Sequence, residues 1–277
     1  MNFVHSGTPA TALLAGRTRL RGGNVAATRH AVIIPSYNTG TRLFDTVAAI
    51  RRQEWPVWVI IDGSTDGTGE ELARIAANDP ALHICVLPQN RGKGAAILHG
   101  LRLAHTNGFT HAVTVDADGQ HSADHIEGLV ALSDDYPEAM ILGVPVFDAS
   151  APAIRITGHV VANFWANLVT LWAGIGDSLF GFRVYPIAPL LRTFEQTRWM
   201  RRFDFDSEAA IRLAWQGVPP INVPTPVRYY RREDGGVSHF NYLRDNALLV
   251  LMYTRLFAVL LANLRGPLAR RFRSFRH

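Results

Sequence analysis

Two carboxylates and a carboxamide stand close together near the middle of the chain. Asp116, Asp118 and Gln120 alternate with other residues in the run Asp-Ala-Asp-Gly-Gln-His, directly after the residues Val-Thr-Val at 113–115. Oxygen ligands at this spacing can share Mg²⁺ or Mn²⁺, and such an ion can neutralise a diphosphate. The alternative is a solvated turn without a metal, since Asp and Gly are also common in turns. The position of the pair at the end of a predicted strand favours the metal site.

A second acidic turn, at residues 61–68, reads Ile-Asp-Gly-Ser-Thr-Asp-Gly-Thr. Asp62 is a candidate to accept a hydrogen bond from a nucleotide base or ribose. Ser64, Thr65 and Asp66 are good caps for a following helix, so a capped turn without a ligand explains the same residues. Both interpretations place Asp62 at the end of a strand.

The only lysine among the 28 basic residues, Lys93, lies in the run Asn-Arg-Gly-Lys-Gly at residues 90–94. A compact ammonium between glycines at the start of a helix suits contact with a phosphate. The run lacks the spacing of a P-loop, which disfavours a P-loop NTPase.

These runs follow short β-branched segments that alternate with segments of helical period. Apolar residues recur at helical spacing in the two intervening segments that contain Leu43, Val47 and Ile50 and Ile97, Leu101 and Ala104. Strands are predicted at residues 30–34, 57–61, 83–87, 111–115 and 139–144. The alternation predicts an α/β fold with a mostly parallel, Rossmann-like sheet flanked by helices. Its binding groups belong at the carboxyl ends of the strands.

After residue 150 the pattern changes to a long apolar segment at 154–173, a Pro-rich strand at 218–230 and an apolar helix at 243–264. Arg255 divides the apolar core of that helix into runs of eight and seven residues. Both runs are shorter than a membrane-spanning segment, so the helix is expected to lie on a bilayer. A core helix or an oligomer contact is the alternative.

Positive charge is concentrated at the two ends of the chain. The net charge is +5; residues 265–277 carry five arginines and residues 1–29 carry four, with no acid in either segment. A basic tail after an apolar helix fits anionic lipid, whereas a nucleic-acid-binding protein would spread basic and aromatic residues over its folded surface. Nucleic acid is therefore disfavoured as a partner.

The length of 277 residues and the 48% of hydrophobic residues exclude a disordered chain. One cysteine, Cys85, excludes a disulfide scaffold and suits a reducing cytoplasm. The predicted organisation is a flexible leader at 1–29, one domain at 30–235, and the apolar helix with its basic tail at 236–277.

Five runs, in order along the chain, resemble the family 2 glycosyltransferases of the GT-A fold, nearest to dolichol- and undecaprenyl-phosphate sugar synthases. The runs are residues 32–38, 62–68, 90–94, 116–121 and 181–183. The resemblance implies a metal-dependent, inverting hexosyltransferase of cell-envelope synthesis. Its donor would be a UDP- or GDP-sugar, and its acceptor a lipid-linked or polyprenyl-phosphate molecule. The protein would be cytoplasmic and peripheral on the inner face of the cell membrane.

The resemblance also assigns roles to individual residues. It implies that Pro35, Tyr37 and Asp62 line the nucleotide pocket and that Asp116 touches ribose or metal. Asp118 and Gln120 would hold the Mg²⁺ or Mn²⁺ ion. Two departures concern the base contact, where Ile61 replaces an acid, and the acceptor pocket, where Phe180 replaces a small residue.

Sugar transfer places further demands on the chain. Negative charge builds on the departing diphosphate, so the ion at Asp118 would stabilise it with help from Lys93 and Arg183. A hydroxyl acceptor needs a general base, for which Asp206 and Glu208 are candidates. A phosphate acceptor is already a nucleophile, which makes the base optional. Helix capping is the alternative role for the two acids, and pairing with a structural carboxylate is the alternative for Arg183.

Two other functional classes remain as alternatives at this point. A non-catalytic protein of the same fold would bind a partner through the C-terminal helix, but the acidic pair, Gln120 and Lys93 argue against it. A nucleotidyltransferase also uses a parallel sheet and carboxylates, and it would release pyrophosphate instead of a nucleoside diphosphate.

Overall fold

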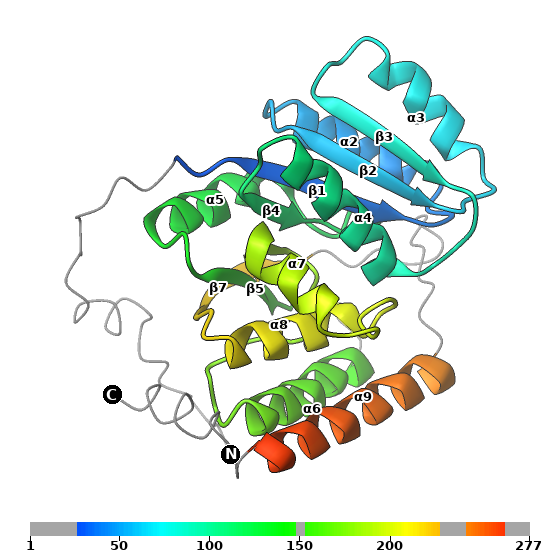
Figure 1. Ribbon diagram of the computed structural model, residues 1–277. Helices are drawn as coiled ribbons and strands as arrows, with labels where there is room; N and C mark the ends of the chain where they lie inside the picture. Colours follow the sequence, from blue (N-terminus) through cyan, green and yellow to red (C-terminus); the bar gives the residue numbers. More distant parts are fainter. Residues whose placement is uncertain (1–26, 148–152, 228–241, 264–277) are drawn as a thin grey trace.

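The computed structural model describes residues 27–147, 153–227 and 242–263. Within these residues the chain forms one mixed sheet with helices on both faces (Figure 1). The predicted leader up to residue 26, residues 228–241 and the arginines of the tail lie outside the described residues.

The sheet has seven strands in the order β3-β2-β1-β4-β6-β5-β7. The strands are β1 His30–Ser36, β2 Val57–Asp62, β3 Leu82–Leu87, β4 His111–Thr114, β5 Met140–Val146, β6 Arg183–Pro186 and β7 Pro220–Pro226. β1 pairs in parallel with β2 and β4, β2 with β3, and β5 with β7. The predicted, mostly parallel sheet is therefore confirmed.

Helices connect the strands and cover the sheet. They are α2 Arg42–Arg51, α3 Thr68–Ala76, α4 Lys93–Thr106, the 3₁₀ turn η1 Ala123–His125, α5 Ile126–Asp135, α6 Ala153–Val169, α7 Ile187–Glu195, α8 Phe205–Trp215 and α9 Tyr242–Asn263. The predicted apolar C-terminal helix is confirmed as α9, within one residue at each end.

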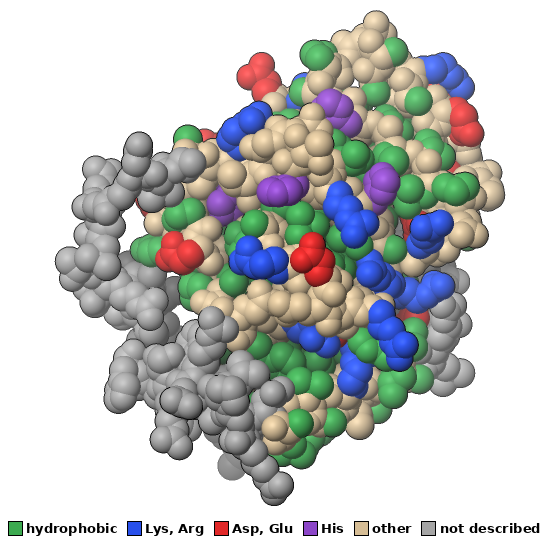
Figure 2. All heavy atoms as spheres, viewed as in Figure 1, with side chains coloured by type: hydrophobic (Ala, Val, Ile, Leu, Met, Phe, Trp, Pro, Cys, Tyr) green, Lys and Arg blue, Asp and Glu red, His purple; other side chains and the backbone are tan. Residues whose placement is uncertain are grey.

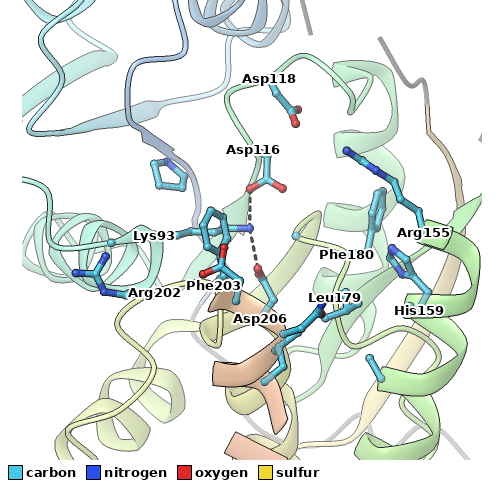
Figure 3. Close-up of a pocket in the computed structure, with 18 of the residues that line it drawn as sticks. Lys93, Asp116, Asp118, Arg155, His159, Leu179, Phe180, Arg202, Phe203 and Asp206 are labelled. Atoms are coloured by element: carbon cyan, nitrogen blue, oxygen red, sulfur yellow. Dashed lines mark hydrogen bonds and ion pairs between the residues drawn. The ribbon is translucent and has the colours of Figure 1, made fainter. Parts of the chain in front are cut away.

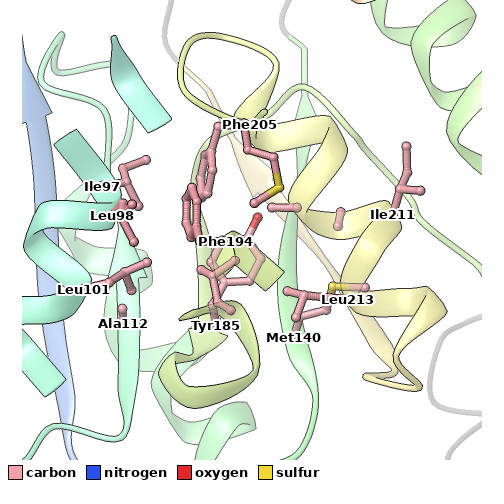
Figure 4. Close-up of a cluster of buried hydrophobic side chains, with 14 of the residues drawn as sticks. Ile97, Leu98, Leu101, Ala112, Met140, Tyr185, Phe194, Phe205, Ile211 and Leu213 are labelled. Carbon is pink, nitrogen blue, oxygen red and sulfur yellow. The ribbon is translucent and has the colours of Figure 1, made fainter. Parts of the chain in front are cut away.

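The sheet divides the hydrophobic core into two clusters, because successive side chains of a strand point to opposite faces. In β1, Ala31 and Ile33 belong to one cluster and Val32 and Ile34 to the other. Both predicted helical stripes are buried, the α4 stripe in the first cluster and the α2 stripe in the second. Figure 4 shows part of the first cluster, where side chains of α4 face Tyr185, Phe194 and Phe205.

β6 is the one strand of the sheet that runs antiparallel to its neighbours, and the alternation of strands and helices did not predict it. It inserts between β4 and β5, with Val184 opposite both Val113 and Ile141. Because β6 runs against β4, the residues before it arrive at the carboxyl end of β4. There, Thr114 Oγ1 donates a hydrogen bond of 2.7 Å to the carbonyl of Gly181.

α6 and α9 pack against each other on the side of the molecule away from α3 and β3 (Figure 1). The Tyr253 hydroxyl on α9 donates a 3.0 Å hydrogen bond to the carbonyl of Ala162 on α6. Among the described helices, α9 alone contains a stretch, Asp245–Ala262, that is long and apolar enough by composition to cross a membrane. Its mean hydropathy is 1.5, and Arg255 within it pairs with Glu208 of α8.

Candidate active site

A cavity of about 1250 Å³ opens at the carboxyl ends of β1, β2 and β4 and continues between α6 and α9. Parallel strands place their following loops at this edge, so polar runs far apart in sequence meet there. The cavity is lined by these predicted site residues: Pro35, Tyr37, Asp62, Lys93, Asp116, Asp118, Gln120 and Asp206. Their roles stay predictions, but their common location follows from the topology of the sheet.

Asp62 holds the loop that precedes α4. Its two carboxylate oxygens accept the backbone N–H groups of Arg91 at 2.9 Å and Gly92 at 2.7 Å. Gly92 has a φ of 99°, and a Cβ atom there would lie 2.5 Å from the carbonyl oxygen of Arg201. Asp62 therefore fixes the position from which the next residue, Lys93, enters the cavity.

Lys93 joins two carboxylates that are far apart in the sequence. Its Nζ lies 2.7 Å from Asp116 Oδ1 and 2.7 Å from Asp206 Oδ2, and its side chain is 12% exposed (Figure 3). Burial disfavours the charge on Lys93, yet the two carboxylates raise its pKa above the ordinary value. The ammonium is thus charged and already neutralised by protein groups.

The two carboxylates respond differently to this arrangement. Burial alone would raise the pKa of Asp116, but Lys93 holds that pKa below its ordinary value. Burial raises the pKa of Asp206, and Lys93 only partly offsets it. Among the described residues, Asp206 Oδ1 is a buried oxygen with no hydrogen-bond partner. Asp116 is therefore the firmly ionised member of the group.

Gly181 makes room for this ion pair. A Cβ atom at Gly181 would lie 2.6 Å from Lys93 Nζ and 2.7 Å from Asp116 Oδ2. Any other residue would push the lysine and the carboxylate apart. The glycine of the Gly-Phe-Arg run thus allows Lys93 and Asp116 to lie close to the backbone at residue 181.

Asp118 lines the cavity beside this group, with its Oδ1 accepting the N–H of Gln120 at 3.1 Å. Burial, together with the charge of Asp116, raises the pKa of Asp118 to about 6. No group of three or more His, Cys, Asp or Glu residues able to hold a metal occurs in the described part of the chain. Two carboxylates with a carboxamide still fit Mg²⁺ or Mn²⁺, since Mg²⁺ commonly takes one or two carboxylates and completes its shell with water and phosphate oxygens.

His121 packs against two phenylalanines and contacts the backbone of the acidic loop. Its ring stacks on Phe182 and meets Phe180 edge-on, at centroid distances of 5.2 and 4.7 Å. Its Nδ1 accepts a long hydrogen bond of 3.4 Å from the N–H of Asp116. Burial lowers the pKa of His121 to about 4, so the ring is neutral at physiological pH. Phe180, which departs from the small residue of the resembled family, therefore serves as packing for this histidine.

Two predicted site residues do not reach the cavity. Arg183 is fully buried and donates from Nη1 to the Tyr185 hydroxyl at 2.8 Å and from Nη2 to the carbonyl of Asp177 at 3.1 Å. Glu208 is fully buried too, and its carboxylate pairs with Arg212 at 2.7 Å and with Arg255. Neither side chain lines the cavity.

Asp206 and Glu208 point in different directions because of the geometry of α8. The helix begins at Phe205, so both acids lie within its first turn and Asp204 occupies the capping position. Residues two positions apart on an α-helix point about 200° apart around its axis. Asp206 therefore faces the cavity, and Glu208 faces α9.

The sequence analysis did not single out three residues around the cavity. Arg155 and His159 of α6 line it, and Figure 3 shows both on the helix that borders the pocket. His159 Nδ1 lies 2.7 Å from Oδ2 of the buried Asp177. The i, i+4 spacing of two basic residues inside an otherwise apolar segment was the available signal.

Apolar side chains of α6 and α9 form much of the remaining wall, together with the polar residues Thr157, Asp245, Asn246 and Thr254. The apolar side chains are Val161, Ala162, Trp165 and Leu168 of α6 and Leu249, Val250, Tyr253 and Phe257 of α9. One cavity therefore joins an acidic end, at β4, to an apolar channel between two helices.

Residues 31–168 match the model of the family described as Glycosyl transferase family 2. An undecaprenyl-phosphate mannosyltransferase of Micrococcus luteus is 26% identical over 221 residues, which cover 75% of this chain and 86% of that protein. A polyprenol monophosphomannose synthase of Mycolicibacterium smegmatis is 30% identical over 163 residues, which cover 57% of this chain and 61% of that protein.

Solved structures with the same fold extend over most of the chain. Glucosyl-3-phosphoglycerate synthase from Mycobacterium tuberculosis is similar with a TM-score of 0.60 and 16% identity, over 87% of this chain and 81% of that one. A mannosyltransferase from Pyrobaculum calidifontis is similar with a TM-score of 0.57 and 19% identity, over 93% of this chain and 71% of that one. These likenesses establish the GT-A-like fold.

Proposed function

The chain belongs to glycosyl transferase family 2, and we propose that it moves a hexose from a nucleoside-diphosphate sugar to a polyprenyl phosphate at a membrane surface. One observation carries the proposal: a single cavity joins the acidic loop after β4 to the apolar channel between α6 and α9. A charged, hydrophilic donor suits the first end, and an isoprenoid chain suits the second.

At the donor end, Asp116, Asp118 and Gln120 would hold a Mg²⁺ or Mn²⁺ ion. When bound, such an ion neutralises the charge that a departing diphosphate acquires. The similar glucosyl-3-phosphoglycerate synthase was solved with Mn²⁺ and UDP-glucose, and the similar mannosyltransferase with Mn²⁺ and GDP-mannose. Pro35, Tyr37 and Asp62 would border the nucleotide, and the raised pKa of Asp118 supports a cation there, since a cation relieves the repulsion between the two carboxylates.

Lys93 and Asp206 would line the part of the cavity in which the sugar binds. Because Lys93 is neutralised by two carboxylates, its contribution is to keep Asp116 ionised and in place. A phosphate acceptor supplies its own nucleophilic oxygen, so Asp206 is required as a partner of Lys93 instead of as a base. Attack from the side opposite the diphosphate gives inversion at the sugar carbon.

At the acceptor end, the relatives from Micrococcus luteus and Mycolicibacterium smegmatis carry the names of enzymes that act on undecaprenyl phosphate and polyprenol phosphate. The apolar channel offers this chain the same class of acceptor. Trp165 of α6 and Phe257 of α9 are among the side chains that would contact the prenyl chain.

The helices that form the channel also present an apolar outer surface, which we call the α6–α9 face. Figure 2 shows hydrophobic side chains gathered at the end of the molecule where Figure 1 places these helices. Its exposed members that do not line the cavity are Ile156, Val160, Phe164, Leu171 and Trp172 around α6 and Leu248, Leu251 and Leu261 on α9. Such a large exposed apolar surface marks an interaction site. A peripheral position on the cytoplasmic leaflet, with the tail arginines on anionic lipid, would cover it.

Purified protein incubated with Mn²⁺, a short prenyl phosphate and either UDP-glucose or GDP-mannose tests the transferase proposal. We expect a prenyl-phosphate sugar and the free nucleoside diphosphate as products. Asp118→Asn should lower the rate by about 100-fold or more, because it removes charge stabilisation of the leaving group. Asp135→Asn, at an exposed position on α5, is the matched control. Release of pyrophosphate, or full activity of Asp118→Asn, would refute the proposal.

Sedimentation with vesicles tests the membrane part separately. Replacing Val160, Phe164, Leu251 and Leu261 by serine removes exposed apolar area that lies outside both the core and the cavity, so folding should be preserved while binding to vesicles of anionic lipid falls. Circular dichroism and the donor-dependent reaction in detergent report whether the fold and the site survive. Unchanged sedimentation of the four-fold variant would remove the α6–α9 face from the proposal.

A further inference from the structure

A histidine–aspartate pair stands on the cavity wall where its polar and apolar halves meet. His159 Nδ1 lies 2.7 Å from Asp177 Oδ2, and His159 lines the cavity. We propose that His159 takes the proton of the acceptor phosphate, so that the acceptor attacks as a dianion. This inference rests on the proposed function, because it assigns a residue to the acceptor side of that same cavity.

Asp177 is built to hold the ring in one tautomer. Its Oδ1 accepts the N–H groups of Leu179 at 2.9 Å and Phe180 at 2.7 Å, and its Oδ2 accepts from Asn163 at 3.0 Å as well as from His159. Burial alone would raise the pKa of Asp177, but these donors hold it below the ordinary value. An ionised Asp177 keeps the proton on Nδ1, which leaves the lone pair of the imidazole on Nε2.

The position of His159 along α6 fits a phosphate head group. Arg155 lies one helical turn before it and lines the same cavity, and its positive charge offsets a small part of the rise that burial and Asp116 cause in the pKa of Asp118. On the other side, Trp165 and Leu168 continue the wall as apolar residues. A phosphate placed at His159 therefore has the donor site on one side and a channel for its prenyl chain on the other.

The proposed step conserves protons and electrons. A phosphate monoester has a second pKa of about 6, so near neutral pH part of the acceptor still carries a proton. That proton moves from the phosphate oxygen to Nε2 of His159. A phosphate oxygen then forms a bond to the anomeric carbon, and the bond from that carbon to the diphosphate breaks with its electron pair on the diphosphate. His159 returns the proton to water after the product leaves.

Arg155, Asp118 and Asp245 line the same cavity as His159, and Asp177 contacts His159 directly. The positive charge of Arg155 favours the dianion of the acceptor. Asp118 faces Arg155, and Asp245 lines the cavity from α9. Once the proton lies on His159, its charge and that of Arg155 should hold the second pKa of the bound acceptor below its free value of about 6.

The test compares the pH dependence of kcat for the wild type and His159→Gln, with a short prenyl phosphate as acceptor. In the wild type at saturating Mn²⁺, which favours the ionised form of Asp118, we expect the rate to fall only below the free acceptor pKa of about 6. In His159→Gln the low-pH limb of the kcat profile, called the acid limb, should move to higher pH by about one unit. The variant should therefore lose about 10-fold or more of its kcat at pH 5.5, and the loss should shrink toward pH 8. Asp177→Asn should move the limb in the same direction, and His105→Gln, exposed on α4, should leave it in place.

A purely structural pair would lower stability or kcat at every pH and leave the shape of the profile unchanged. Parallel profiles for wild type and His159→Gln would therefore overturn the inference. ³¹P NMR of the prenyl phosphate bound to the wild-type protein gives a second measurement that needs no variant. An acceptor pKa below its free value supports the inference, and an unshifted or raised value refutes it. Failure of the proposed function is distinct, because the wild type would then transfer no sugar at all.

Discussion

The cavity has one polar wall at the carboxyl ends of the strands, called the sheet wall, and one wall formed by α6 and α9, called the helical wall. The two walls are stabilised in different ways. On the sheet wall, Asp62 and Lys93 are fixed by hydrogen bonds and ion pairs of 2.7 to 2.9 Å to loops and helices distant in sequence. On the helical wall, α6 and α9 share a packed seam but leave large apolar side chains outside it. Val250 is 67% exposed and Trp172 is 63% exposed.

The difference indicates which parts of the site exist before any partner arrives. The polar wall is preorganised, because its charges are already oriented by the protein and need no rearrangement to meet a ligand. The helical wall is packed only toward the core, and its outer surface leaves large apolar side chains exposed. The polar wall is therefore a property of the folded chain, whereas the proposed membrane contact would complete the helical wall.

The largest effect on this comparison is expected from Lys93→Met. The change leaves the buried carboxylate of Asp206 and the partly exposed carboxylate of Asp116 without their cation, which costs about 3–5 kcal/mol of unfolding free energy. Urea unfolding measures the loss. The double variant Lys93→Met, Asp206→Asn should recover part of it, since one buried charge is removed. A single variant as stable as the wild type would show that the sheet wall is not held by this ion pair.

Glu208→Gln is expected to act on the helical wall alone. Glu208 is fully buried and pairs with Arg212 and Arg255, so the amide leaves two arginines with no compensating charge and costs about 2–3 kcal/mol. Hydrogen exchange should become faster along α9 while the amides of α4 keep their protection. Glu127→Gln, exposed on α5, is the control. Equal loosening of α4 would mean that the two walls unfold as one unit.

The smallest effect is expected from groups that belong to neither wall. Burial, with a contribution from His111, lowers the pKa of His30 to about 4. An unfolded histidine titrates near 6.5, so between these values the unfolded chain binds more protons and stability is lost as the pH falls. We expect about 1 kcal/mol less stability at pH 5.5 than at pH 7 from this group. His30→Asn should flatten the dependence, and an unchanged slope in that variant would contradict the assignment.

Much of the fold could be predicted from the sequence because its signals are local. The β-branched segment that begins at His30 became β1, and the stripe of Leu43, Val47 and Ile50 became the buried face of α2. Hydrophobic period depends on neighbouring residues alone, so it can be read without knowing the tertiary structure. β6 was not predicted, because its four residues show no period and its place depends on two strands that come earlier in the chain.

The sequence by itself determined the order of the elements, the polar runs at the ends of the strands and the family to which they belong. The parallel connection of strands then brings those runs to one edge, whatever the details of packing. For this reason eight of the predicted site residues line one cavity.

Only the tertiary structure decided which polar groups meet. Lys93 pairs with Asp206 across 113 residues of sequence, and the rotation of α8 sends Asp206 to the cavity and Glu208 to α9. Asp177 reaches His159 because the loop before β6 packs against α6, where Asn163 also donates a hydrogen bond to Asp177. Such pairings depend on how rigid elements rotate and pack against one another, and that orientation is set by the whole core instead of by the residues that finally touch.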